Sequence, residues 1–344
     1  MSDHKIHISG NKTIKFLLLI SLIWLILTYA SGLILPLVVA IVIATLLNKP
    51  TEKMKSWGFP KWLAISISML LSIVFFTLLF WLISTQVNNM AQDWPTIKEK
   101  ALQKYHVFST WMQDRFQINP KETFNENVNF FDQIQKLAEG FLASVSNVIS
   151  NSFIILIYVI LLLMQKKLFI GFFKKLVNNN QGASKILKGS SEIISGYLFG
   201  KGKIMFLLAI LYYAGFKIGQ VPFALFLALF AALFSIIPYV GNIIGGGVAI
   251  ILSYLYAGGG PALTVLGVIM AAQLLENYVL TPWIIGDEID LNPFITVFGV
   301  ILFSVLWGMV GAIFALPLVG VLKVLFENTK NLEPYAYLLK KQKE

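Results

Sequence analysis

Long apolar runs alternate with short polar loops along most of this chain of 344 residues. Phe16 to Leu47 is almost continuously apolar, and Ser31, Gly32 and Pro36 interrupt it. This run exceeds the roughly 20 residues that cross a bilayer but is short for two full crossings. The pattern therefore predicts a tight hairpin of two short membrane helices. A third span is expected from Trp62 to Gln86.

Residues 87–140 form the one substantial polar stretch, in which acidic and basic residues nearly balance. From Trp94 to Met112 apolar residues recur at steps of three and four, which predicts an amphipathic helix. A second helix is expected to begin near Val128 and to lead into a fourth span, Phe141 to Met164. The polar stretch is therefore interpreted as a helical insert between the third and fourth spans.

Beyond Ile204 the apolar segments become short and are separated by glycine and proline. Some hold too few residues to cross about 30 Å at about 1.5 Å per residue. Re-entrant or broken helices are the expected outcome, and such segments are typical of transporter binding sites. The expected segments are 204–216, 221–237, 242–257, 262–285, 293–307 and 309–326.

Composition agrees with a membrane protein, since 57% of the residues are hydrophobic and only 13% are charged. Soluble proteins carry about 25% charged residues. We therefore expect an all-α polytopic membrane protein with about eight transmembrane helices, some of them re-entrant or broken. The expected organisation is: N-terminal membrane helices 1–86, extracytoplasmic helical insert 87–140, membrane helix 141–164, basic cytoplasmic loop 165–203, transport core 204–326 and cytoplasmic tail 327–344.

The net charge of +10 comes almost entirely from lysines, and Arg115 is the only arginine. The lysines gather in the N-terminal residues, in 48–61, in 165–203 and in the C-terminal tail. The positive-inside rule places these four regions in the cytoplasm and leaves 87–140 on the outer side of the membrane. Lysines with this distribution set topology, so no nucleic-acid partner is expected.

A single carboxylate stands out within the apolar half of the chain. Glu276 is the only acidic residue among the 94 positions from Ile193 to Gly286. An ionisable group in a membrane span costs about 2.5–3.5 kcal/mol on insertion scales and indicates a functional site. Gln273 and Asn277 share its helix face at spacings of three and four. No salt-bridge partner is apparent, so both a neutral Glu276 and a mobile cation partner stay open.

Helix breaks surround this polar stripe. Pro282 is expected to kink or end the helix that carries Glu276, since it clashes with the carbonyl four residues back. Pro238, Tyr239, Gly241 and Asn242 indicate either a hinge with a polar tip or close helix packing through small residues. In the last apolar run, Gly308, Gly311 and Pro317 indicate helix packing and a kink.

An acidic loop follows, with Asp287, Glu288 and Asp290 as candidate cation ligands or as members of a solvated turn. Asn292 and Pro293 match the N-cap and first position of a helix. No metal site and no cofactor are expected, because the chain has no cysteine and its three histidines lie in the tail and the insert. Phosphate-loop and intramembrane protease motifs are also missing, so an enzyme is not expected.

Several of these residues together resemble the autoinducer-2 exporter family of bacterial membrane proteins, also described as PerM-type permeases. The departure is Asn242, where many relatives carry proline. The two short N-terminal spans, the polar insert after the third span and the basic loop after the fourth also fit, so the resemblance covers nearly the whole chain. The matching pieces are Ile237-Pro238-Tyr239-Val240-Gly241, Gln273-Leu274-Leu275-Glu276-Asn277, Val279-Leu280 with Pro282 and Gly286, Leu291-Asn292-Pro293, Gly308 with Gly311-Ala312, and Ala315-Leu316-Pro317-Leu318.

The resemblance implies export of a small polar solute or signal such as autoinducer-2, in a homo-oligomer that is a pentamer in the family. It implies an elevator-like movement, with coupling to protons or sodium in some relatives. Membrane lipid is an expected partner. Two alternatives stay open: a sodium or lithium/proton antiporter that uses Glu276, and a membrane scaffold that binds a partner through 87–140.

Overall fold

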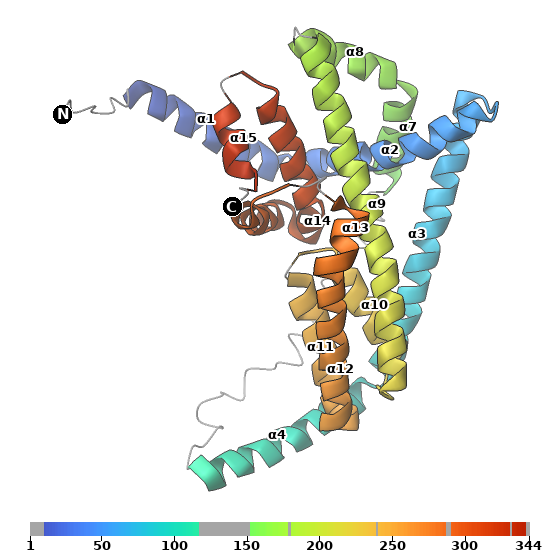
Figure 1. Ribbon diagram of the computed structural model, residues 1–344, viewed down its shortest axis with the longest axis vertical. Coiled ribbons are helices and arrows are strands. Elements are labelled where there is room, and N and C mark those ends of the chain that lie inside the picture. Colours follow the sequence, from blue (N-terminus) through green and yellow to red (C-terminus); the bar gives the residue numbers. More distant parts are fainter. Residues whose placement is uncertain are drawn as a thin grey trace.

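The computed structural model describes residues 10–116, 152–177, 180–238, 240–286, 290–330 and 332–341. Within them the fold is all-helical, and the only β-type contact is an isolated bridge between Leu291 and Lys340 (Figure 1). The helices are α1 (Gly10–Tyr29), α2 (Ser31–Ser56), α3 (Lys61–Gln92), α4 (Trp94–Phe116), α7 (Ser152–Met164), α8 (Lys166–Val177), α9 (Asn180–Ile218), α10 (Ala224–Phe234), α11 (Val240–Ala257), α12 (Gly259–Leu275), the π-helix η1 (Glu276–Leu280), α13 (Thr281–Ile284), α14 (Pro293–Glu327) and α15 (Glu333–Leu339).

Five helices of the described residues are long and apolar enough to cross a membrane: α2, α3, α9, α14, and α12 with its continuation to Ile284. A sixth crossing results if α7 and α8, which meet at a bend of 74°, count as one span. The prediction of an all-helical polytopic membrane protein is therefore confirmed. The count of about eight membrane helices stays a prediction.

The predicted N-terminal hairpin is wrong, because the chain bends at Ala30 but does not fold back (Figure 1). The amide of Ala30 donates to the carbonyl of Ile26, and the amide of Ile34 donates to that of Ala30, both at 2.9 Å. These hydrogen bonds carry a helical path across the junction between α1 and α2. Pro36 lies buried inside α2, so it does not break the run either.

The amphipathic helix predicted after Trp94 is confirmed as α4. The second helix predicted from Val128, and most of the fourth span, lie outside the described residues. The last part of that span is α7.

The segment 165–203 is not a loop where the structure describes it. It forms α8 and the first half of α9, whose 39 residues continue past the boundary drawn at residue 203. Lysine is a good helix former, and buried residues such as Ile186, Ile193 and Tyr197 give α9 an apolar face within the basic stretch. The loop prediction for this segment was wrong because it used the lysines alone and not the apolar residues between them.

Two apolar cores organise the molecule. The larger gathers residues of α9, α10, α11, α12 and α14, and the smaller one joins α2, α3 and α7. Helix α9 packs against α10, α12, α13 and α14, and Figure 1 shows α13 lying against the middle of α9. The face that α9 turns toward α12 and α13 is where the polar site lies.

Candidate functional site

Glu276 begins a π-helical turn inside a membrane-length helix. The segment Glu276–Leu280 is π-helical and lies between α12 and α13, and Pro282 follows in the first turn of α13. Because Pro282 lacks an N–H and crowds the carbonyl four residues earlier, an ordinary α-turn is unfavourable there. The helix widens instead of ending. Such π-bulges occur frequently at functional sites.

Lys201 of α9 is the partner of Glu276. The Lys201 Nζ lies 2.6 Å from the Glu276 Oε1, and the two side chains are only 9% and 6% exposed. The expectation that Glu276 has no salt-bridge partner is therefore wrong. Lys201 was counted among the lysines that set topology. Its spacing of four from Tyr197 and three from Ile204, both buried, was the signal that places it on the apolar face of α9.

A close approach of two helices brings this pair together. Gly200 precedes Lys201, and a Cβ at Gly200 would lie 2.7 Å from the Ile285 side chain and 3.6 Å from the Ile284 carbonyl oxygen. Only a residue without a side chain lets the end of α13 pack this closely on α9. Gly200 therefore allows α9 to approach α13 closely enough for Lys201 to reach Glu276.

Gln273 extends the pair into a small network. Its Nε2 donates to the Glu276 Oε2 at 3.2 Å and to the hydroxyl oxygen of Tyr212 at 3.3 Å. The predicted pairing of Gln273 with Glu276 on one helix face is thus confirmed by contact. Asn277 is exposed instead, and the wider π-turn shifts the residues after Glu276 around the helix axis. Together the buried groups offer a cation, an anion, an amide and a hydroxyl.

The predicted break near Pro238 separates α10 from α11. Pro238 is half-buried in this turn, and a Cβ at Gly241 would overlap the carbonyl oxygen of Phe234. Tyr239 lies outside the described residues, as does the side chain of Asn242. Among the contacts of the described residues, no hydrogen bond joins this turn to Glu276. Gly241 is therefore required for a tight turn between α10 and α11.

A second tight turn divides α14. Trp307 and Gly308 have non-helical backbone angles, with φ of +62° at Gly308. A Cβ at Gly311 would overlap the carbonyl oxygen of Phe303, so the chain folds back closely on itself here. The predicted kink is confirmed at Gly308. Pro317 is buried within the helix and adds no break of its own.

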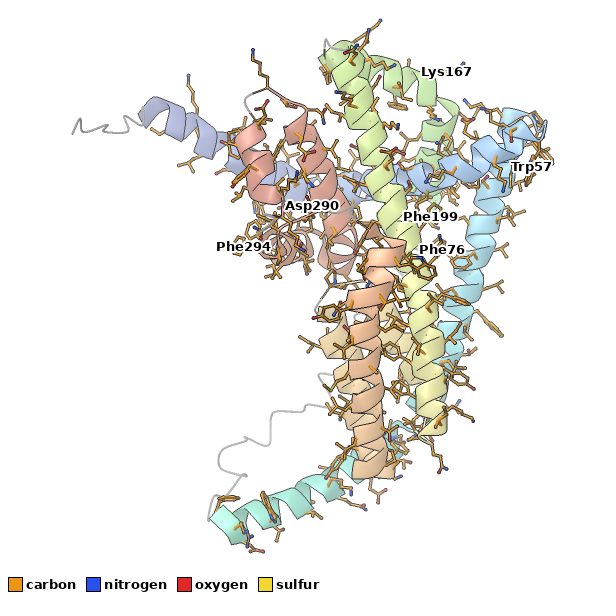
Figure 2. All side chains as sticks on the ribbon, viewed as in Figure 1. Trp57, Phe76, Lys167, Phe199, Asp290 and Phe294 are labelled. Atoms are coloured by element: carbon orange, nitrogen blue, oxygen red, sulfur yellow. The ribbon has the colours of Figure 1, made fainter. Side chains whose placement is uncertain are left out.

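A buried lysine contacts Asp290, the last acidic residue of this segment. Lys323 Nζ donates to the backbone oxygen of Asp290 at 2.8 Å and lies 3.7 Å from its Oδ2. Asp287 and Glu288 lie outside the described residues, and no group of three metal-ligating side chains occurs within the described part of the chain. Asp290 is thus engaged by Lys323 and only partly exposed to solvent. Figure 2 shows its position beside the start of α14.

The helix start predicted at Asn292 is confirmed. The Asn292 side chain accepts a hydrogen bond from the Phe294 amide at 2.9 Å, and Pro293 occupies the first turn of α14. The backbone amide of Asn292 donates to the carbonyl of Leu339, also at 2.9 Å. The last residue of α15 is therefore hydrogen-bonded to the residue that caps α14.

The fold and this network define a multi-pass helical membrane protein with a buried ion pair at a widened turn of one span. Comparison with known proteins gives the family. The family model described as AI-2E family transporter matches residues 14–331. This chain belongs to that family.

Three relatives match over most of their length at low identity. The chain is 23% identical to the AI-2 transport protein TqsA of Escherichia coli K12 over 341 residues, which cover 98% of each chain. It is 25% identical to YueF of Bacillus subtilis 168, whose name describes a transport protein, over 88% of this chain and 86% of YueF. It is 24% identical to PerM of Escherichia coli K12, whose name describes a permease, over 86% and 87%.

Proposed function

We propose that this protein is a secondary transporter that exports a small polar solute or signal across the bacterial cytoplasmic membrane, with Glu276 as its gating carboxylate. The observation that carries the proposal is the ion pair between Glu276 and Lys201, buried where a membrane-length helix widens. Ionisable residues inside membrane spans mark solute and ion pathways. Membership of a transporter family supports the same conclusion.

The chemistry of the network fits a small polar solute. Lys201 supplies donors, Glu276 supplies acceptors, and Gln273 and Tyr212 can do both. A solute with hydroxyl or carbonyl groups can replace the hydrogen bonds that these side chains make to each other. Because separating the buried pair without a substitute is costly, we expect opening to be coupled to solute entry. Gln273 would then orient the solute, and Asn277 would meet it on the exposed side of the helix.

The substrate class follows by analogy with one relative. TqsA is named for transport of AI-2, so autoinducer-2 is the first solute to test. The remaining features of the proposal come from the sequence: about eight membrane helices, cytoplasmic N- and C-termini, an extracytoplasmic 87–140 insert, and a homo-oligomer that is a pentamer by family resemblance. The turn at Pro238 and Gly241, the widened turn before Pro282 and the helix start at Pro293 would act as the hinges.

Export of a solute is favoured over sodium/proton antiport. The charge of Glu276 is already matched by Lys201, and Asp290 contacts Lys323. A sodium ion at either carboxylate would have to displace a buried lysine. The scaffold alternative, in which the 87–140 insert binds a partner, is less favoured because α4 packs on α11 of the same chain.

Reconstituted vesicles separate these possibilities. Purified protein in proteoliposomes should move labelled autoinducer-2 faster than empty liposomes do, and a proton gradient should change the rate. An antiporter would instead acidify or alkalise the lumen when sodium or lithium is added, without solute flux. A scaffold would do neither. Absence of flux for autoinducer-2 and for other small polar solutes under every gradient would refute the proposal.

A further inference from the structure

Helix α8 has the composition of a helix that lies on a membrane surface. It leaves α7 at an angle of 74° and has no buried residue. The exposed apolar side chains recur on one side of the helix, and its charged residues are all lysines. A helix with an apolar face and a lysine-rich border lies in the lipid headgroup region. The exposed apolar residues are Leu168, Phe169, Phe172 and Leu176, and the lysines are Lys166, Lys167, Lys174 and Lys175.

An apolar groove begins beside the first turn of α8. It runs between α3 and α7, has a volume of about 420 Å³, and is lined from Trp62 to Ile73 on α3 and from Phe153 to Met164 on α7. The twelve residues of α3 from Trp62 to Ile73 rise about 16 Å. One leaflet of a bilayer contributes about 15 Å of hydrocarbon. The groove therefore matches the length of a single acyl chain, and Ser66 is the one polar residue in its lining.

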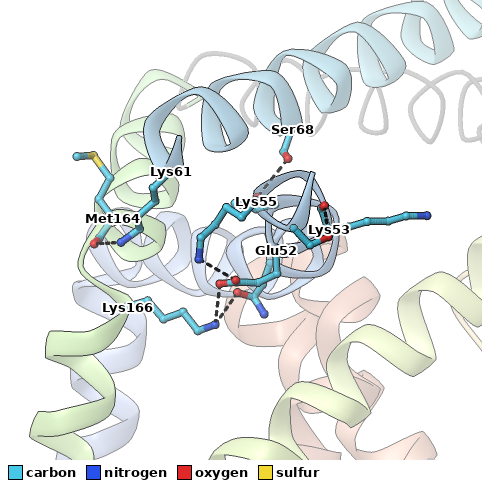
Figure 3. Close-up of polar contacts among 10 residues, drawn as sticks. Glu52, Lys53, Lys55, Lys61, Ser68, Met164 and Lys166 are labelled. Carbon is cyan, nitrogen blue, oxygen red and sulfur yellow. Dashed lines mark hydrogen bonds and ion pairs between the residues drawn. The ribbon is translucent and has the colours of Figure 1, made fainter. Parts of the chain in front are cut away.

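Lys61 precedes the lining residue Trp62 and lies beside Met164 at one end of the groove (Figure 3). Lys61 donates to the backbone oxygen of Met164, which joins α3 to the end of α7. Lys166 donates to the Asn48 Oδ1 at 2.8 Å and lies 3.5 Å from the Glu52 Oε1. Both Lys61 and Lys166 are thus held at the rim rather than extended into solvent.

The positive charge at this corner exceeds what its acidic residue can balance. Glu52 is paired with Lys55 at 2.8 Å and with Lys166 at 3.5 Å. Lys61 lies nearby in Figure 3, and Lys167 is exposed on the first turn of α8 (Figure 2). Trp62 lies at the same level and is 63% exposed, as expected for a side chain at a membrane interface. A second protein copy with the same lysines would meet repulsion here. A phosphate group would be attracted.

We propose that the corner formed by α3, α7 and α8 binds an anionic phospholipid. Lys61, Lys166 and Lys167 hold the phosphate headgroup, and one acyl chain lies in the α3–α7 groove. Helix α8 lies in the plane of the headgroups, with its apolar face among the upper parts of the acyl chains. This lipid site lies on the surface of the protein and shares no residue with the Glu276 network.

Lipid retention tests the headgroup contacts. The full-length protein in detergent is mixed with phosphatidylglycerol and phosphatidylcholine of identical acyl chains, and bound lipid is measured by native mass spectrometry. We expect the protein to prefer phosphatidylglycerol. The double variant Lys61→Gln/Lys167→Gln should bind it about 30-fold more weakly, since each lysine near an anionic headgroup contributes about 1 kcal/mol. Its phosphatidylcholine binding should not change.

A matched control removes two lysines elsewhere. Lys185 and Lys330 are exposed and lie away from the groove, so Lys185→Gln/Lys330→Gln loses the same charge without touching the corner. This variant should keep its affinity for phosphatidylglycerol within about twofold of the original protein, because screened charges at a distance contribute little. Equal loss in both variants, or no headgroup preference in the original protein, would overturn the proposal.

Groove occupancy is tested by a single cysteine, because the chain has none of its own. Ser66→Cys carrying a fluorophore should be quenched by phosphatidylglycerol with brominated acyl chains. Ile157→Trp, which narrows the groove, should abolish that quenching while helix content is retained. If instead Ser66→Cys forms disulfide cross-links between copies in the membrane, the groove is a protein interface and the lipid site is wrong.

Discussion

Removing one member of the Lys201–Glu276 pair should destabilise the protein much more than removing both. At 2.6 Å and an effective dielectric constant of about 20, the two charges attract by about 6 kcal/mol. Desolvation offsets part of this gain. A lone charge left at a site below 10% exposure costs about 3–5 kcal/mol. Lys201→Met and Glu276→Leu should each lower the free energy of unfolding by that amount.

The double variant Lys201→Met/Glu276→Leu leaves no buried charge and fills similar volume. Replacing a buried ion pair by apolar residues is often neutral or stabilising, so its stability should return to within about 1 kcal/mol of the original protein. Reversible unfolding in mixed micelles with increasing dodecyl sulfate, followed by far-ultraviolet circular dichroism, measures all three variants. If the two single effects simply add in the double variant, the ion-pair account is refuted.

An exposed pair on the same helix provides the control. Lys188 and Glu192 of α9 lie 3.9 Å apart with side chains 79% and 61% exposed. Exposed pairs of this kind contribute roughly 0–1 kcal/mol. Lys188→Met and Glu192→Leu should therefore have small effects, alone or together, under the same conditions.

Two further predictions concern the turns and the loop beside the site. Gly241→Ala should destabilise the protein by about 3 kcal/mol or more, because its Cβ would overlap the Phe234 carbonyl. Gly267→Ala, which has open space around its Cβ, should stabilise the protein by up to about 1 kcal/mol. Thermal unfolding of the two variants measures the difference. Lys323→Met should release the segment around Asp290, which limited proteolysis would detect as faster cleavage there; unchanged cleavage would refute a clamping role.

Much of the architecture could be predicted because its signals are local. Hydropathy located α3 and the span formed by α12 and its continuation to Ile284, and the step of three and four after Trp94 located α4. The cap at Asn292 and the kink at Gly308 depend on neighbouring residues alone, so the sequence was sufficient for both. Each of these features follows from backbone hydrogen bonding and periodicity within one segment.

The central pairing could not be predicted because it joins residues 75 positions apart. Lys201 lies in a basic stretch, where the positive-inside rule accounts for each lysine without asking which face of a helix it occupies. Only the buried neighbours of Lys201 on α9 distinguish it from exposed Lys203. The prediction of an N-terminal hairpin was wrong because Ser31 and Gly32 permit a chain reversal but do not require one.

Transport by the double variant is the most direct test of the central claim. Lys201→Met/Glu276→Leu is expected to fold and reconstitute like the original protein, so its flux reports on chemistry rather than on stability. In proteoliposomes of equal protein content, we predict that its autoinducer-2 flux falls to the level of empty liposomes while the original protein transports. If the folded double variant transports at the original rate, the Lys201–Glu276 pair is only structural and the account is contradicted.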